Sequence, residues 1–320
     1  MLAEICEAEL LEAIVTEGLT KYYGKILALN DLNLKIGAGH CVGFLGPNGA
    51  GKSTTIKILC NLIRPVRGKA FINGHDANTE STSALKNVGA LVETPEFYDY
   101  LTPVEVLSYF GKLRGLADPD LKQRIRQVLE IVKLSEWSNT RIGKFSRGMK
   151  QRLGIGQAIL HDPPILILDE PALGLDPRGM YEMREIIKTM VKEGKTAFLA
   201  SHMLHEVQET CDQVALLDKG KLLAYDSISN LETLFKTRKI HVDLLRPLKP
   251  TEIDRIRKME KVKTVTAEEK SLVINIDGTE ADQAQLLTML VKEMSVPVAS
   301  FRPSMEALED VYLQLIKEGN

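Results

Sequence analysis

The feature that most constrains this chain is a glycine-rich run of nine residues: Gly46, Pro47, Asn48, Gly49, Ala50, Gly51, Lys52, Ser53 and Thr54. It matches G-x-x-x-x-G-K-[ST] and lies between an apolar run that predicts a buried strand, 41–45, and a segment with helical spacing, 55–60. Glycines let the loop turn its N–H groups inward, with no Cβ to block a phosphate. The N-terminus of the following helix adds a partial positive charge. The run therefore predicts a nucleoside-triphosphate site, with Lys52 on the β/γ-phosphates and Ser53 on Mg²⁺.

Two later apolar runs end in residues that suit phosphate chemistry. The run 164–168 ends in Asp169 and Glu170. Continuous apolar character is typical of a central parallel strand, and ligands bind beyond the carboxyl ends of such strands. We expect Asp169 to bind Mg²⁺ through water and Glu170 to polarise the attacking water. The run 197–200 leads to His202, which we expect at the same sheet edge and in the same reaction.

Two further candidates follow from position. Tyr23 lies in an N-terminal region with strand patterns and is expected to stack on adenine. Glu93 follows the strand pattern at 88–92, and its carboxylate is expected to reach Mg²⁺, because hard cations favour carboxylate oxygens. The alternatives are a packing role at a strand end for Tyr23 and a solvated loop for Glu93.

Length and charge limit the possible classes of protein. The 320 residues suffice for about two domains, and a formal net charge of −2 provides no basic field for nucleic acid. No stretch approaches about eighteen uninterrupted apolar residues, so no membrane span is predicted. The four cysteines lie far apart and predict free thiols in a reducing compartment rather than a metal site.

The pattern along the chain predicts two domains. The first covers 13–236 and carries a helical insertion at about 95–160 between strand patterns. A charged run at 236–239 is a candidate linker, and the second domain covers 239–320. Its order, β-α-β-β-α-β followed by a helix from Ser304, suggests a small ferredoxin-like module of α+β class.

Taken together, these motifs resemble the ATP-binding subunit of ABC transporters over about residues 13–235. The resemblance implies an α/β P-loop ATPase cassette with a β-rich lobe, a RecA-like core and a helical insertion. It makes 46–54 the Walker A loop, 165–169 the Walker B strand, Glu170 the general base and His202 the switch histidine on the γ-phosphate.

The same resemblance assigns two further motifs. Residues 145–149 stand at the signature motif, normally Leu-Ser-Gly-Gly-Gln, and 174–176 match the D-loop. In that family two subunits form a head-to-tail dimer. The resemblance implies that the signature of one subunit closes over ATP on the other, so the expected nucleotide-binding residues include Ser146, Gly148, Met149 and Asp176.

Two departures from the family pattern narrow the resemblance. Glu93 replaces the usual glutamine, and Arg147 replaces the first signature glycine. Both are similar to drug and peptide-antibiotic exporters of the bacitracin and lantibiotic-immunity type. This implies an ATP- and Mg²⁺-dependent ATPase at the cytoplasmic face of the membrane. It would power a separate permease that exports a drug, a peptide antibiotic or a hydrophobic compound, and residues 96–107 would dock on that permease.

Two other functions compete with an exporter subunit. One is a soluble ABC ATPase acting on ribosomes or DNA, but such proteins usually carry two cassettes or long coiled coils, and no nucleic-acid partner is expected here. The other is a nucleotide-gated regulator without hydrolysis, which the presence of Glu170 and His202 disfavours.

Overall fold

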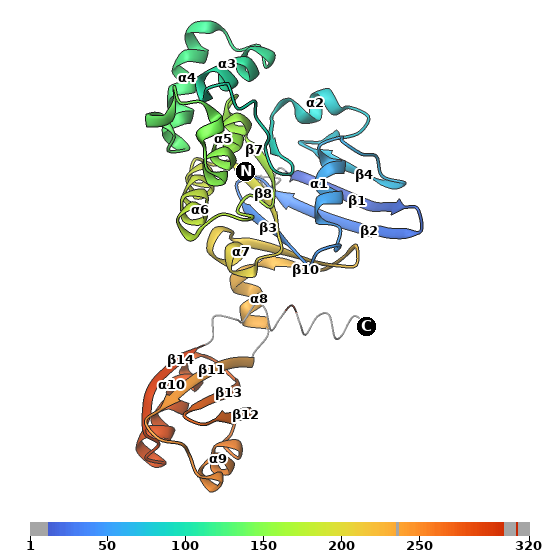
Figure 1. Cartoon of the computed structure of the whole chain (residues 1–320). Helices are drawn as coiled ribbons and strands as arrows, with labels where there is room; N and C mark the ends of the chain where they lie inside the picture. Colours follow the sequence, from blue (N-terminus) through green and yellow to red (C-terminus); the bar gives the residue numbers. More distant parts are fainter. Residues whose placement is uncertain (1–11, 235–236, 304–311, 313–320) are drawn as a thin grey trace, which may run out of the picture. The chain divides into compact units, whose positions relative to one another are not determined.

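The computed structural model describes residues 12–234, 237–303 and 312 (Figure 1). The predicted helix from Ser304 lies outside these residues except at Tyr312. The chain divides into two compact units, and the division along the chain falls between Asp226 and Ser227. Within the described residues, no helix combines the length and apolar character that crossing a membrane requires.

The first unit contains two sheets. The antiparallel sheet has the order β2-β1-β4-β5 and the six-stranded sheet the order β10-β9-β3-β8-β7-β6. The strands of the first are β1 (Glu12–Tyr23), β2 (Ile26–Gly37), β4 (Arg67–Ile72) and β5 (His75–Asp76). Those of the second are β3 (Cys41–Leu45), β6 (Val88–Leu91), β7 (Ile165–Asp169), β8 (Thr196–Ser201), β9 (Gln213–Asp218) and β10 (Lys221–Ser227).

The six-stranded sheet has a parallel centre. Strand β3 pairs in parallel with β8 and β9, and β7 pairs in parallel with β6 and β8. Every residue of β3, β7 and β8 is buried, which explains why these strands read as continuous apolar runs. Helix α1 (Lys52–Leu59) packs with both sheets in one core, where the rings of Phe44 and Phe198 lie 5.1 Å apart.

The helical insertion lies between β6 and β7, at the predicted place in the chain. It contains α3 (Pro103–Leu113), α4 (Asp118–Ile131), α5 (Arg147–Ile159) and two short 3₁₀ turns, Ser135–Trp137 and Ile142–Lys144. Helix α3 begins at a capping box, in which Thr102 Oγ1 accepts from the N–H of Glu105 and Glu105 Oε2 accepts from the N–H of Thr102.

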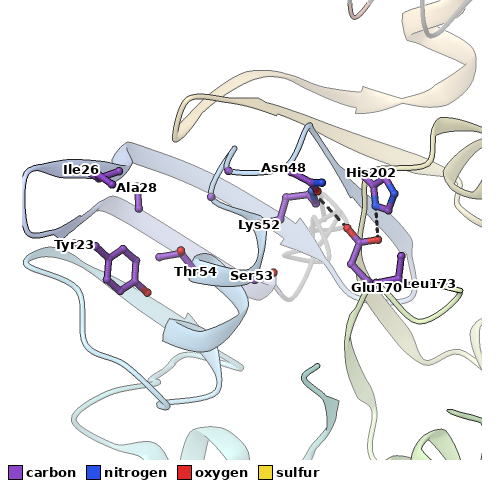
Figure 2. A pocket seen from close by; sticks show the side chains of 12 residues that line it. Tyr23, Ile26, Ala28, Asn48, Lys52, Ser53, Thr54, Glu170, Leu173 and His202 are labelled. Carbon is purple, nitrogen blue, oxygen red and sulfur yellow. Dashed lines mark hydrogen bonds and ion pairs between the residues drawn. The ribbon is translucent and has the colours of Figure 1, made fainter. Parts of the chain in front are cut away.

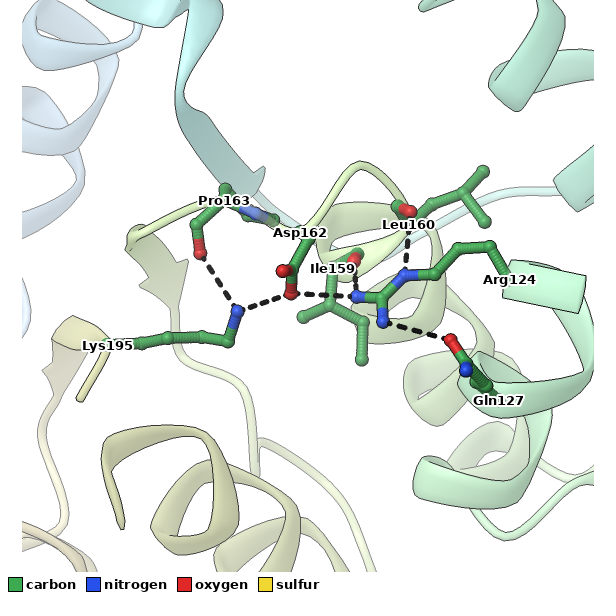
Figure 3. Close-up of polar contacts among 7 residues, drawn as sticks. All are labelled: Arg124, Gln127, Ile159, Leu160, Asp162, Pro163 and Lys195. Carbon is green, nitrogen blue, oxygen red and sulfur yellow. Dashed lines mark hydrogen bonds and ion pairs between the residues drawn. The ribbon is translucent and has the colours of Figure 1, made fainter. Parts of the chain in front are cut away.

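A polar cluster ties α4 to the end of α5 (Figure 3). Arg124 donates to the carbonyl oxygens of Leu160 and Ile159, at 3.1 and 2.9 Å, and pairs with Asp162. Asp162 also accepts a hydrogen bond from the buried Lys195, at 2.5 Å. Carbonyl oxygens at a helix C-terminus lack hydrogen-bond donors within their own helix. Arg124, on the neighbouring helix α4, provides these donors at the end of α5.

After β7 the chain forms α6 (Pro177–Lys192), β8, α7 (Leu204–Thr210), β9, β10 and α8 (Ile228–Leu234). The second unit contains β11 (Thr237–Leu244), α9 (Pro250–Arg257), β12 (Val262–Glu268), β13 (Ser271–Asp277), α10 (Glu280–Thr288) with a π-helical turn Met289–Glu293, and β14 (Val298–Pro303).

The second unit has its own sheet and core. Its strands pair antiparallel in the order β12-β13-β11-β14 around buried residues such as Ile240, Ile274 and Leu290. The order of elements is the predicted β-α-β-β-α-β order; assignment to the ferredoxin-like folds stays a prediction.

The candidate linker at 236–239 was misplaced. Thr237, Arg238 and Lys239 belong to β11, where they pair with Asp277, Ile276 and Asn275 of β13. A run of charged side chains indicates exposure to solvent, but it does not prevent the backbone from joining a sheet. The structure also groups α8 with the second unit, whereas the sequence placed it before the boundary. The domain limits expected from the sequence, 13–236 and 239–320, stay a prediction.

Candidate nucleotide-binding site

The glycine-rich run forms the loop between β3 and α1. Gly51 has a φ of 109°, which L side chains rarely adopt, and a Cβ there would lie 2.6 Å from the carbonyl oxygen of Ala28. Only glycine therefore fits where the loop passes β2 and enters the helix. The result is a backbone cradle at the N-terminus of α1, and its donor groups suit a polyphosphate.

Lys52 is buried, with a relative exposure of 6%. Its Nζ donates to the carbonyl oxygens of Gly46 and Pro47, at 2.8 and 3.2 Å, and lies 3.5 Å from Glu170 Oε1. These contacts hold an ammonium group over the loop. A phosphate oxygen would give it a charge-assisted partner stronger than a neutral carbonyl.

Ser53 and Asp169 come together as the sequence predicts. Ser53 Oγ donates to Asp169 Oδ1 at 3.1 Å. Burial raises the pKa of Asp169, the charge of Glu170 raises it further, and the hydrogen bond from Ser53 opposes both. One hydroxyl and one carboxylate suit Mg²⁺, which typically takes few protein ligands and completes its shell with phosphate oxygens and water. In the described part of the chain no three His, Cys, Asp or Glu residues form a metal-binding group.

Glu170 and His202 also meet, at the carboxyl ends of β7 and β8 (Figure 2). Glu170 has a φ of 47°, and its N–H donates to the carbonyl oxygen of Ala200 at 3.0 Å. Its Oε2 lies 2.8 Å from His202 Nδ1 in a hydrogen bond. The carboxylate is thus held between an ammonium on one side and an imidazole on the other. This geometry can orient a water molecule.

A cavity of about 480 Å³ opens over these groups. Its lining includes the predicted Tyr23, Asn48, Gly49, Gly51, Lys52, Ser53, Thr54, Glu170 and His202. It also includes three apolar residues that the sequence did not single out, Ile26, Ala28 and Leu173. Ile26 is paired with Tyr23 across the β1–β2 hairpin, and both side chains are exposed. The short turn between the two strand patterns could have indicated that Ile26 lies opposite Tyr23.

The other predicted residues do not line this cavity. Gly46, Pro47 and Ala50 complete the loop. Glu93 is exposed, and its Oε1 pairs with Lys57 Nζ at 2.6 Å; this hydrogen bond lowers the pKa of Glu93. Its role as a Mg²⁺ ligand stays a prediction.

The signature and D-loop residues act as helix caps in this chain. Ser146 caps α5, where its Oγ accepts from the N–H of Met149 at 3.2 Å, and Gly148 lies in the first turn. Asp176 caps α6, where its Oδ1 accepts from the N–H of Gly179 at 3.0 Å. Contacts of these residues with nucleotide stay predictions.

A parallel core with this loop, two carboxylates beyond β7 and a histidine beyond β8 defines a P-loop nucleotide-binding protein. A family model described as ABC transporter matches residues 29–173. The chain belongs to the ABC transporter family, as an ATP-binding subunit with ATPase activity. This confirms the predicted family and fold class.

Known proteins resemble this chain beyond the residues that the family model matches. The bacitracin transport ATP-binding protein BcrA of Bacillus licheniformis is 45% identical over 211 residues, 66% of this chain and 68% of BcrA. The uncharacterized ABC transporter ATP-binding protein YcbN of Bacillus subtilis is 34% identical over 96% of this chain and 97% of YcbN. The linearmycin resistance ATP-binding protein LnrL of Bacillus subtilis is 32% identical over 93% and 96%. A solved structure of the ATP-binding subunit of an ABC transporter matches with a TM-score of 0.63 and 30% identity, over 70% of this chain and 93% of that one.

Proposed function

We propose that this chain is the Mg²⁺-dependent ATPase subunit of an exporter, acting as a dimer on a separate membrane permease. The observation that carries the proposal is the position of Glu170, which touches Lys52 and His202 over the phosphate loop. The triphosphate binds the loop and Lys52, while adenine stacks on Tyr23 beside Ile26. Ser53 and Asp169 would hold a Mg²⁺ ion, which would neutralise negative charge on the phosphates.

In the hydrolytic step, Glu170 orients a water molecule and accepts its hydrogen bond. Oxygen of that water forms a bond to the γ-phosphorus as the bond to the ADP oxygen breaks, which yields ADP, phosphate and a proton. His202 keeps the carboxylate directed at the water. Lys52 stabilises the charge on the phosphate oxygens, since its ammonium is already fixed at the loop.

A dimer would give a role to the motif at residues 145–149, which does not line the cavity. Ser146, Gly148 and Met149 begin a helix of thirteen residues but do not line the cavity of their own chain. A helix N-terminus with a serine hydroxyl suits a phosphate. We therefore assign this motif to ATP bound by a second copy, and two-fold symmetry gives two such sites.

The class of exported compound is proposed from the names of two relatives. BcrA is described as a bacitracin transport protein and LnrL as a linearmycin resistance protein. We extend this to the export of an antibiotic or another hydrophobic or peptide-like compound, from a position at the cytoplasmic face of the membrane. A separate permease would provide the membrane-spanning part.

Glu170→Gln tests the assignment of the base. The variant keeps the shape of the side chain but cannot accept a proton, so we expect turnover to fall roughly 10²–10⁴-fold. Binding of Mg²⁺–ATP should persist, and a dimer should accumulate in light scattering with ATP. The matched control is Glu193→Gln, an exposed glutamate at the end of α6, which should keep the parent rate. Turnover by Glu170→Gln at the parent rate would show that the base is another group.

A further inference from the structure

Arg147 lies on the D-loop of its own chain. It is the first residue of α5 and stands where the family has its first signature glycine. A Cβ on Gly174 would lie 2.3 Å from Arg147 Nη1 and 2.6 Å from its Cζ, so the guanidinium fills the place of a side chain at residue 174. Gly174 has a φ of 70°, a conformation that suits glycine. The arginine of one motif and the glycine of the other are therefore complementary in shape.

Two more contacts attach α5 to the same region. A Cβ on Gly148 would lie 3.8 Å from Leu175 Cδ2, which places Leu175 against the first turn of the helix. Five residues after Arg147 on α5, Arg152 pairs with Glu182 of α6 at 3.3 Å, and both side chains are largely buried. Helix α5 is thus attached to the D-loop and to the helix that follows it.

The other end of this segment lies in the nucleotide site. Glu170 and Leu173 line the cavity, and Gly174 comes next in the chain. Between them the backbone is closed by hydrogen bonds from the N–H of Leu173 to Glu170 and from the N–H of Leu175 to Ala172, at 3.1 and 3.2 Å. The segment from Glu170 to Gly174 therefore consists of two successive hydrogen-bonded turns.

We propose that Arg147 is a positioning residue that couples the two ATP sites of the dimer. Through Gly174 it relates the state of its own cavity to the position of Ser146 and Gly148, which face the ATP of the second copy. This inference rests on the proposed dimer and goes beyond it, because it names the side chain through which one site affects the other. Without the guanidinium, each site should bind and hydrolyse ATP independently.

The test is the ATP dependence of turnover by the full chain. The parent should show a Hill coefficient above 1, with two as its limit for two sites. Arg147→Ala should lower the coefficient to about 1 without changing the melting temperature. Arg141→Ala, which removes another exposed arginine of the insertion, is the control and should keep the parent coefficient.

Gly174→Ala supplies the second arm, because its methyl group displaces the guanidinium. It should lower the coefficient as Arg147→Ala does, and the double variant should lower it no further. If Gly174→Ala fails to fold because of its positive φ, the Hill coefficients of Arg147→Ala and Arg141→Ala still test the inference. The inference would be overturned if Arg147→Ala kept a Hill coefficient above 1, or if the parent showed none above 1. It would also be overturned if Arg141→Ala lowered the Hill coefficient as much as Arg147→Ala does. The proposed dimer fails separately, if Glu170→Gln forms no dimer with ATP.

Discussion

At the scale of single residues, Glu93 is the position where sequence and structure suggest different partners. The sequence places it near Mg²⁺, whereas the structure pairs it with Lys57, five residues after Lys52 on α1. That hydrogen bond raises the pKa of Lys57, to which the charge of Asp169 also contributes. The Lys57–Glu93 pair therefore lies within the electrostatic reach of the proposed metal site.

We expect Glu93→Gln to hydrolyse ATP but to need more Mg²⁺ for half-maximal turnover. Removing one negative charge weakens the attraction of the site for a divalent cation, and it leaves Lys57 without its anionic partner. The measurement is turnover against Mg²⁺ at saturating ATP. Glu96→Gln removes an exposed charge three residues away, which has no such pair among the described residues, and serves as the control. Superimposable curves for parent and Glu93→Gln would make Glu93 a solvated loop residue.

At the scale of elements, the insertion depends on the polar cluster of Arg124, Asp162 and Lys195 (Figure 3). The cluster joins α4, the end of α5 and the start of β8. Lys195 is buried, so its charge depends on Asp162 for neutralisation. Asp162 has a φ of 56°, which asparagine also adopts readily.

Asp162→Asn should therefore destabilise the chain through charge, by about 1 kcal/mol at pH 7, because the Asp162 side chain is 64% exposed and solvent screens its pair with Lys195. The hydrogen bond from Lys195 is the main cause that lowers the pKa of Asp162 in the folded state. The stabilisation from this hydrogen bond is complete at pH values above the pKa of the aspartate in the unfolded chain, about 4. It is lost as the pH falls through the lower pKa of Asp162 in the folded chain. Urea unfolding of parent and variant should show a constant difference from pH 7 to 5 that shrinks below about pH 4.

The control for this prediction is Asp254→Asn, which removes a carboxylate of similar exposure, 62%, from an i,i+3 pair on α9 whose cationic partner, Arg257, is exposed rather than buried. Exposed pairs of this kind contribute at most about 1 kcal/mol, so the control should unfold close to the parent. A difference that stays the same from pH 7 to 3 would mean that the loss in Asp162→Asn has a cause other than charge.

At the scale of the whole molecule, the two units have separate cores. The core of the first is formed by residues up to Tyr225, and that of the second by residues from Ile240 to Phe301. All the cavity residues belong to the first unit. No residue of the second core therefore lines the cavity.

A chain that ends at Leu234 should fold, bind ATP and keep ATPase activity. The cut leaves β10 and α8 intact and removes β11 as a whole, so no sheet is divided. Cooperative thermal unfolding and a nucleotide-binding titration check this, with the full chain beside it. An insoluble product, or one that never binds ATP, would show that the two units stabilise each other.

The predictions that succeeded depend on residues that are neighbours in sequence or at the ends of paired strands. The loop 46–54 needs only its own glycines and the helix after it. Glu170 and His202 meet because β7 and β8 are parallel neighbours, so their carboxyl ends share one edge. The sequence alone therefore determined the glycine-rich loop, the position of Glu170 beside His202 and the central sheet.

Tertiary structure alone decided which distant surfaces face each other. Ile26 and Leu173 enter the cavity through a hairpin register and a loop path that no motif records. Glu93 pairs with Lys57, and Arg147 covers Gly174, because tertiary packing sets those distances. The physical reason is that spacing along a strand or helix follows from local geometry, whereas contacts between elements depend on how all the side chains between them pack.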